Sequence, residues 1–190
     1  MRQMVMDLSA LPAFHADWWL TTAGTAAAER ALQSGAQCIC LYGPEGAGKS
    51  HLLAMAAEGG AVVADNLEDL TPEGQERIFH ALNAKKRVVV ASRMPVAQVE
   101  GLLPDLKSRL LTGGQVEVLP PTDDELRALL QRWAEARQLV LPQAVVEYVL
   151  ARAARSTHTL AALVRRLDAL SLEQKRAITV PLAKAVLGGA

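Results

Sequence analysis

The segment from residue 43 to residue 50 has the residue types and spacing of a loop that holds phosphate groups. Its sequence fits the pattern G-x-x-x-x-G-K-[ST], and it lies between an expected strand and an expected helix. Glycines let a backbone curl around an anion, and the helix that follows presents its positive end to the same point. An ordinary glycine-rich turn lacks this context. The residues predicted to contact a nucleotide are Gly43, Pro44, Glu45, Gly46, Ala47, Gly48, Lys49 and Ser50.

Three side chains define the chemistry expected at this loop. Lys49 would reach the β- and γ-phosphates, and the Ser50 hydroxyl would hold Mg²⁺. Asp65 ends the apolar run 61–64, which is where an acid that orients the metal should stand. The pattern therefore predicts ADP or ATP as the bound nucleotide, with Mg²⁺ at Ser50 and Asp65.

The residue after Asp65 bears on the rate of hydrolysis. ATPases with a phosphate loop that hydrolyse ATP rapidly usually carry a second acid there, which polarises the attacking water. This chain has Asn66 instead. An amide cannot accept a proton, so we expect a nucleotide that is bound well and hydrolysed slowly. Glu68 could be proposed as a substitute, but its position in a loop favours a solvated charge.

Short apolar runs alternate with helical segments over the first 120 residues. Strands are expected at 37–42, 61–65, 87–92 and 115–119, and helices at 24–33, at 50–58 and from Thr71-Pro72 onward. This alternation predicts a parallel α/β sheet. Cys38 and Cys40 lie two apart and should face one side of their strand as small core residues.

The chain changes character after Pro120-Pro121. Thr122 and Glu125 have the spacing of a capping box, and the helical periodicity that follows continues to Leu187. We therefore predict an N-terminal peptide at 1–12, an α/β nucleotide-binding domain at 13–120 and a small all-helical domain at 121–190.

Composition excludes several classes of protein. Twenty basic and 20 acidic residues cancel, so the clustered positive surplus of a strong nucleic-acid binder is missing. Apolar residues make up 51% of the chain, yet no uninterrupted run approaches the roughly 18 residues that span a membrane. These features favour a cytoplasmic globular protein without a membrane partner or strong direct DNA binding.

Beyond the phosphate loop, the chain resembles the AAA+ family, and within it the DnaA/Hda group of bacterial replication proteins. The resemblance rests on the Asp65-Asn66 pair, on VVVASRMPVAQVEGLLPDLKSRL at 88–110, and on the helical tail from Pro120 to Leu187. It implies an AAA+ parallel sheet core followed by a helical lid. The tail resembles the lid of Hda proteins, which end there, whereas DnaA continues into a DNA-binding domain.

The resemblance also implies roles for particular residues. Ser92 would be the sensor 1 group close to the γ-phosphate, and Arg109 would be an arginine finger acting in a partner's site, although a surface ion pair is the common fate of a helix arginine. The head of the chain is similar to the peptide that docks Hda proteins on the β sliding clamp of DNA polymerase III, although chance apolar residues in a disordered start could look the same. The clamp-contacting residues would be Gln3, Met4, Met6, Asp7 and Leu8.

Two departures from the family pattern stand out. Only residues 51–60 separate the phosphate loop from the second strand, where the family has a further strand and helix; the missing strand is an edge strand, so the sheet should be trimmed rather than broken. His158 occupies the sensor 2 position, which usually holds arginine, and a mostly neutral imidazole lacks the guanidinium fork.

Three functions fit these observations. The first is a negative regulator of replication initiation that docks on the clamp and stimulates hydrolysis of DnaA-bound ATP through Arg109. The clamp would link this regulator to the nucleoid. Such a regulator is also compatible with a homodimer. The second is a self-contained AAA+ ATPase, such as a helicase loader or a transposition helper. The third is an adaptor that has lost its nucleotide response, against which the intact phosphate loop argues.

Overall fold

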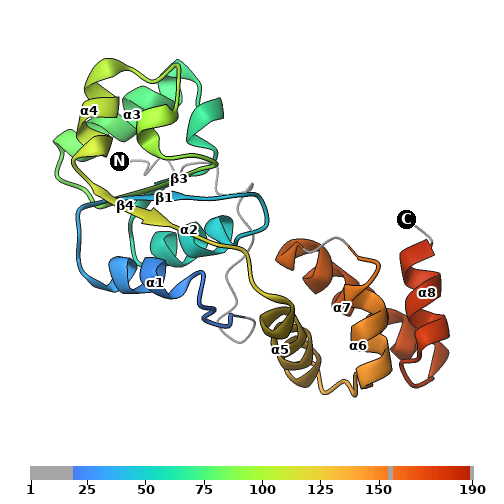
Figure 1. Ribbon diagram of the computed structural model, residues 1–190. Coiled ribbons are helices and arrows are strands. Elements are labelled where there is room, and N and C mark those ends of the chain that lie inside the picture. Colours follow the sequence, from blue (N-terminus) through green and yellow to red (C-terminus); the bar gives the residue numbers. More distant parts are fainter. Residues whose placement is uncertain (1–18, 154–155, 189–190) are drawn as a thin grey trace. The chain divides into compact units, whose positions relative to one another are not determined.

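The structure is a computed structural model that describes residues 19–153 and 156–188, in two compact units (Figure 1). Within the described residues, the first unit comprises residues 23–120, and the second comprises residues 121–188 together with residues 19–22. The first is an α/β unit and the second is entirely helical, as the change of pattern at Pro120-Pro121 predicts.

The first unit is built on a parallel sheet of four strands in the order β2-β3-β1-β4. The strands are β1 (Cys38–Tyr42), β2 (Val62–Ala64), β3 (Val88–Ser92) and β4 (Gly114–Glu117). Tyr42 is in register with Ser92 on one side and with Glu117 on the other. The carboxyl ends of these strands therefore meet at one edge of the sheet, which is where ligands bind in open parallel sheets.

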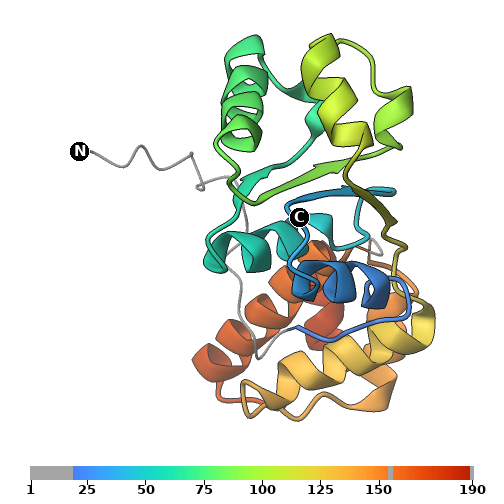
Figure 2. The same ribbon diagram turned by 90° about the vertical axis from the view of Figure 1, so that its left-hand side faces the viewer.

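Helices cover both faces of this sheet (Figures 1 and 2). One face carries α1 (Ala26–Gln33) and α2 (Lys49–Glu58), and the other carries α3 (Pro72–Asn83) and α4 (Pro104–Leu111). Every residue of β3 is buried, as expected for a valine-rich central strand that is covered on both faces. Cys40 is buried in the cluster beneath α3 and α4, and Cys38 packs against the same cluster. The two cysteines thus share one face, as their spacing predicts.

The short connection after the phosphate loop has the expected consequence. α2 ends at Glu58 and is capped by Gly59, Gly60 turns the chain with a φ of 81°, and β2 begins at Val62. β2 is therefore one of the two edge strands of the sheet within the described residues, and β4 is the other. The prediction of a trimmed α/β core followed by a helical domain is confirmed.

The second unit packs four helices around one apolar core. They are α5 (Asp123–Glu135), α6 (Gln143–Leu150), α7 (Thr157–Gln174) and α8 (Val180–Gly188). Every one of them contributes to the core, because each has an apolar stripe at helical spacing. Representative buried side chains are Leu126, Leu130, Trp133, Val146, Leu160, Leu167 and Val186.

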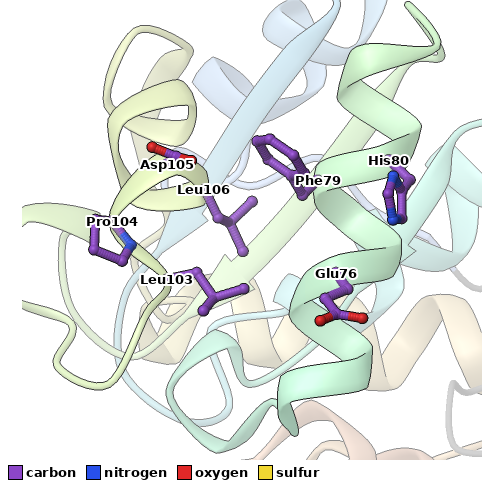
Figure 3. Close-up of a pocket in the computed structure, with 7 residues that line it drawn as sticks. All are labelled: Glu76, Phe79, His80, Leu103, Pro104, Asp105 and Leu106. Carbon is purple, nitrogen blue, oxygen red and sulfur yellow. The ribbon is translucent and has the colours of Figure 1, made fainter.

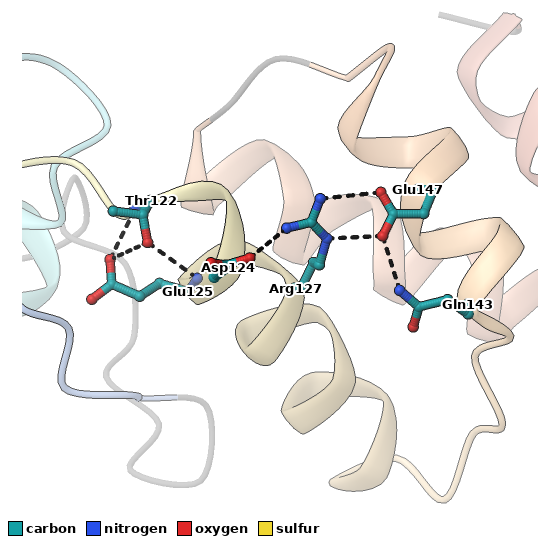
Figure 4. A network of polar contacts seen from close by, with 6 residues as sticks. All are labelled: Thr122, Asp124, Glu125, Arg127, Gln143 and Glu147. Atoms are coloured by element: carbon teal, nitrogen blue, oxygen red, sulfur yellow. Dashed lines mark hydrogen bonds and ion pairs between the residues drawn. The ribbon is translucent and has the colours of Figure 1, made fainter.

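Polar contacts fix the start of α5 and join it to α6 (Figure 4). The Thr122 hydroxyl accepts a hydrogen bond from the Glu125 N–H at 3.3 Å, and the Glu125 carboxylate accepts one from the Thr122 N–H at 2.8 Å. This is the predicted capping box. Farther along α5, Arg127 pairs with Asp124 at 2.6 Å and with Glu147 of α6 at 2.8 Å.

Among the described residues, no helix is both long enough and apolar enough to cross a lipid bilayer.

Candidate phosphate-loop site

The loop at 43–50 joins the carboxyl end of β1 to the start of α2. Gly46 and Gly48 have φ values of 78° and 98°, a conformation that favours glycine, and Gly48 caps α2 directly. At Gly43 the neighbouring strand approaches closely, since a Cβ there would lie 2.0 Å from the Val118 carbonyl oxygen. The glycine spacing of the motif is thus required by the backbone path, and the α2 N-terminus faces the space that the loop surrounds.

Lys49 lies inside the loop. The residue is only 8% exposed. Its ammonium group donates hydrogen bonds to the carbonyl oxygens of Gly43 at 2.6 Å and Pro44 at 2.8 Å. Burial lowers the pKa of Lys49, and the carboxylates of Asp65 and Glu68 partly oppose that effect. The ammonium group is therefore a desolvated positive charge, which attracts phosphate more strongly than a solvated one.

Ser50 and Asp65 come together although fifteen positions separate them in the chain. The Ser50 hydroxyl donates a 2.6 Å hydrogen bond to Asp65 Oδ2, and Asp65 Oδ1 accepts the Asn66 N–H at 2.9 Å. A hydroxyl beside a carboxylate, next to a phosphate loop, is a donor set that suits Mg²⁺. These two residues would hold the ion, which would neutralise phosphate charge.

Ser92 closes the same edge of the sheet from β3. The residue is 1% exposed, and its carbonyl oxygen accepts the Gly43 N–H at 3.2 Å, so it lies directly beside the first glycine of the loop. Its hydroxyl donates to the Met94 carbonyl oxygen at 2.6 Å in the turn that follows. The sensor 1 role implied by the resemblance stays a prediction.

Glu68 is the residue that sequence reasoning interpreted wrongly. It lies in the short 3₁₀ helix η3 (Leu67–Asp69), and its side chain is only 15% exposed, so it is not a solvated loop charge. Glu68 Oε1 accepts the Arg93 backbone N–H at 3.3 Å and pairs with the Arg93 guanidinium at 3.2 Å.

Arg109 lies on α4, on the sheet face away from α1 and α2. The residue is exposed, its guanidinium carbon lies 5.2 Å from the centre of the Phe79 ring on α3, and no ion pair involves it among the described residues. Phe79 also lines a pocket of 360 Å³ between α3 and α4 (Figure 3). The residues around that pocket are Glu76, Phe79, His80, Leu103, Pro104, Asp105 and Leu106.

Some predicted residues lie outside the described part of the chain. They are the clamp-peptide residues Gln3, Met4, Met6, Asp7 and Leu8, and the side chain of His158. Within the described part, no cluster of three or more metal-ligating side chains occurs, and Cys38 and Cys40 are free thiols.

Known proteins resemble both units of this chain. Residues 123–187 match the family model of the Hda lid domain. Domain III of the replication initiation protein DnaA from Thermotoga maritima superposes with a TM-score of 0.77 at 16% identity, over 94% of this chain and 98% of that one. AMPPCP-bound DnaA from Aquifex aeolicus (TM-score 0.64, 18% identity) and the RuvB Holliday junction branch migration motor of T. maritima (0.62, 17%) share the fold over 83% and 87% of this chain. The matched part covers 67% of the A. aeolicus DnaA chain and 66% of the RuvB chain.

The trimmed parallel sheet, the phosphate loop at its carboxyl edge and the helical unit that follows make up the fold that this chain shares with DnaA and RuvB. The helical unit is Hda-like, because residues 123–187 match the model of the Hda lid domain.

Proposed function

We propose that this protein is a nucleotide-bound regulator that stimulates ATP hydrolysis in a DnaA partner through Arg109. It would bind ADP or ATP with Mg²⁺ at the phosphate loop, dock on the β sliding clamp through residues 3–8, and lower initiation competence. The observation that carries the proposal is the state of Arg109. Its guanidinium is exposed, supported by Phe79 and not paired with a carboxylate in the described part of the chain.

An exposed guanidinium suits a function in trans. A finger that enters a neighbour's site neutralises charge on the transferring phosphoryl group, an effect of about 10³–10⁵ in rate in measured systems. An arginine already bound to a carboxylate would first have to break that ion pair. Stacking on Phe79 restrains the side chain yet leaves its hydrogen-bond donors available.

The geometry of the loop supports the nucleotide part of the proposal. Lys49 is hydrogen-bonded within the loop, Ser50 is hydrogen-bonded to Asp65, and α2 begins at Lys49, which supports a phosphate site at this loop. Hda-like proteins and DnaA share this class of fold, and the two solved DnaA structures bound to AMPPCP show a nucleotide analogue in that class. The balanced charge of the chain, 20 basic and 20 acidic residues, favours protein partners over direct DNA binding.

The deciding experiment measures hydrolysis of labelled ATP bound to purified DnaA, with clamp-loaded DNA and this protein added. The wild-type protein should accelerate hydrolysis, and Arg109→Ala and deletion of residues 1–8 should each abolish the effect. Arg30→Ala is a matched control, because Arg30 is an exposed helix arginine on α1. If the wild type has no effect on DnaA-bound ATP although it binds nucleotide, the regulatory function is wrong and a self-contained ATPase becomes the better hypothesis.

A further inference from the structure

Glu68 holds a buried carboxylate oxygen that no part of the described structure satisfies. Oε1 is paired with Arg93, whereas Oε2 is buried and has no hydrogen-bond partner among the described residues. Buried carboxylate oxygens normally have partners, and an unsatisfied one calls for an explanation. Its neighbour Asp69 behaves differently, because it also contacts Arg93, at 3.5 Å, but its side chain is 65% exposed.

Several contacts fix the position of Glu68 at the nucleotide edge of the sheet. Asn66 adopts a left-handed conformation, with φ 48°, directly after Asp65, and η3 begins at the next residue. The partner of Glu68 is Arg93, which follows Ser92 at the carboxyl end of β3. The carboxylate thus lies between the ends of β2 and β3, on the same edge as the loop that follows β1.

The charge of Glu68 acts on the phosphate loop. Its carboxylate is one of the groups that act on the Lys49 ammonium, together with Asp65. The acid expected immediately after Asp65 is missing, and Asn66 donates its backbone N–H to Asp65 instead. Glu68 is therefore the acid nearest in the chain to Asp65, and one of its carboxylate oxygens is buried.

We propose that Glu68 is the catalytic acid–base residue for a slow hydrolysis of ATP in this protein's own site, and that Arg93 is its positioning residue. This inference rests on the proposed binding of nucleotide at the loop. When ATP is bound, the Glu68 carboxylate accepts a proton from water as the water oxygen bonds to the γ-phosphorus and the bond from that phosphorus to the bridging oxygen of ADP breaks. The proton then passes to solvent, and the products are ADP and inorganic phosphate.

The roles of the two oxygens follow from their contacts. Arg93 engages Oε1 through both its guanidinium and its backbone N–H, and so orients the carboxylate. Oε2 is left without a protein partner, so its lone pairs are available for a proton once the nucleotide-bound site admits water. General acid–base catalysis contributes about 10²–10⁴ in rate, so a protein that retains such a group keeps measurable turnover even without an acid at position 66.

The test is single-turnover hydrolysis of labelled ATP by the full-length protein alone, with binding of a fluorescent ADP measured in parallel. Glu68→Gln should lower the hydrolysis rate at least tenfold (about 1.4 kcal/mol in the barrier) and leave ADP affinity within threefold. Arg93→Ala should lower kcat several-fold with little change in KM, as expected for a positioning residue. Asp69→Asn, which removes the exposed partner of Arg93, should leave both quantities within twofold.

A second readout does not depend on turnover. Aluminium fluoride with ADP mimics the transferring phosphoryl group, and the wild type should bind that complex more tightly than ADP alone. Glu68→Gln should lose most of this preference, with an unchanged melting temperature as evidence that it is folded.

The outcomes separate the two proposals. If Glu68→Gln retains hydrolysis within twofold of wild type, or if wild type binds ADP but shows no hydrolysis, the role of Glu68 is wrong and nucleotide binding still stands. If neither ADP nor ATP binds to wild type, the proposed function fails at its first step, and the inference about Glu68 fails with it.

Discussion

The Ser50 hydroxyl and the Asp65 carboxylate are joined by a hydrogen bond of 2.6 Å across the gap between the phosphate loop and β2. Ser50 lies in the first turn of α2, and Asp65 directly follows the edge strand β2. The pair links the two motifs that the sequence presents separately. Because the trimmed sheet ends at β2, Asp65 depends on β3 alone for its strand support.

Asp65→Ala should uncouple nucleotide binding from Mg²⁺. The variant loses the carboxylate that would hold the ion with Ser50, so added Mg²⁺ should no longer increase ATP affinity, whereas in wild type it should increase it at least tenfold. The measurement is a fluorescent-nucleotide titration with Mg²⁺ or with EDTA. Equal Mg²⁺ enhancement in Asp65→Ala and wild type would contradict the assignment of the metal site.

Nucleotide affinity should fall as pH rises through the alkaline range below 10.5, the ordinary pKa of lysine. Burial lowers the pKa of Lys49 in the free protein, whereas bound phosphate favours its charged form and raises that pKa. Binding therefore takes up a proton in this range, and affinity decreases with increasing pH. Isothermal titration in two buffers of different ionisation enthalpy would detect the uptake. In Lys49→Met affinity should be at least tenfold weaker and this proton uptake should disappear.

Phe79→Ala should weaken the stimulation of DnaA-bound ATP hydrolysis without abolishing it. The ring supports the Arg109 guanidinium at 5.2 Å, and an exposed cation–π contact contributes about 0.5–1 kcal/mol. That corresponds to a loss of about two- to fivefold in rate, far below the loss expected for Arg109→Ala. A Phe79→Ala variant as inactive as Arg109→Ala would indicate that Phe79 contacts the partner itself.

Two leucines of α7 provide a matched pair for the stability of the lid. Leu160 is 0% exposed in the lid core, and Leu172 is 71% exposed on the same helix. Leu160→Ala should reduce the free energy of unfolding by about 2–5 kcal/mol, because it leaves a cavity. Leu172→Ala should change it by less than about 0.5 kcal/mol, as a surface substitution does. Urea denaturation followed by circular dichroism measures both, and equal losses would place Leu160 outside the core.

The sequence by itself determined those features that depend on local chemistry. The phosphate loop is defined by glycine and Lys-Ser spacing, the α5 start by the Thr122–Glu125 box, and the parallel sheet by apolar runs alternating with helical ones. These are properties of short segments, so a periodicity or a motif suffices to predict them. The short connection at 51–60 also predicted the loss of an edge strand, because a chain segment that short cannot supply one.

Only the tertiary structure decided which charges are solvated. Glu68 and Asp69 are adjacent acids in one short turn, yet the first is 15% exposed and the second 65%. Arg93, which follows β3, contacts both acids, but only Glu68 also accepts its backbone N–H, from 25 positions away. In the same way, Arg109 is accompanied by Phe79 of α3 rather than by a carboxylate. Burial and pairing of a charge depend on residues distant in the chain, and no local pattern encodes that distance.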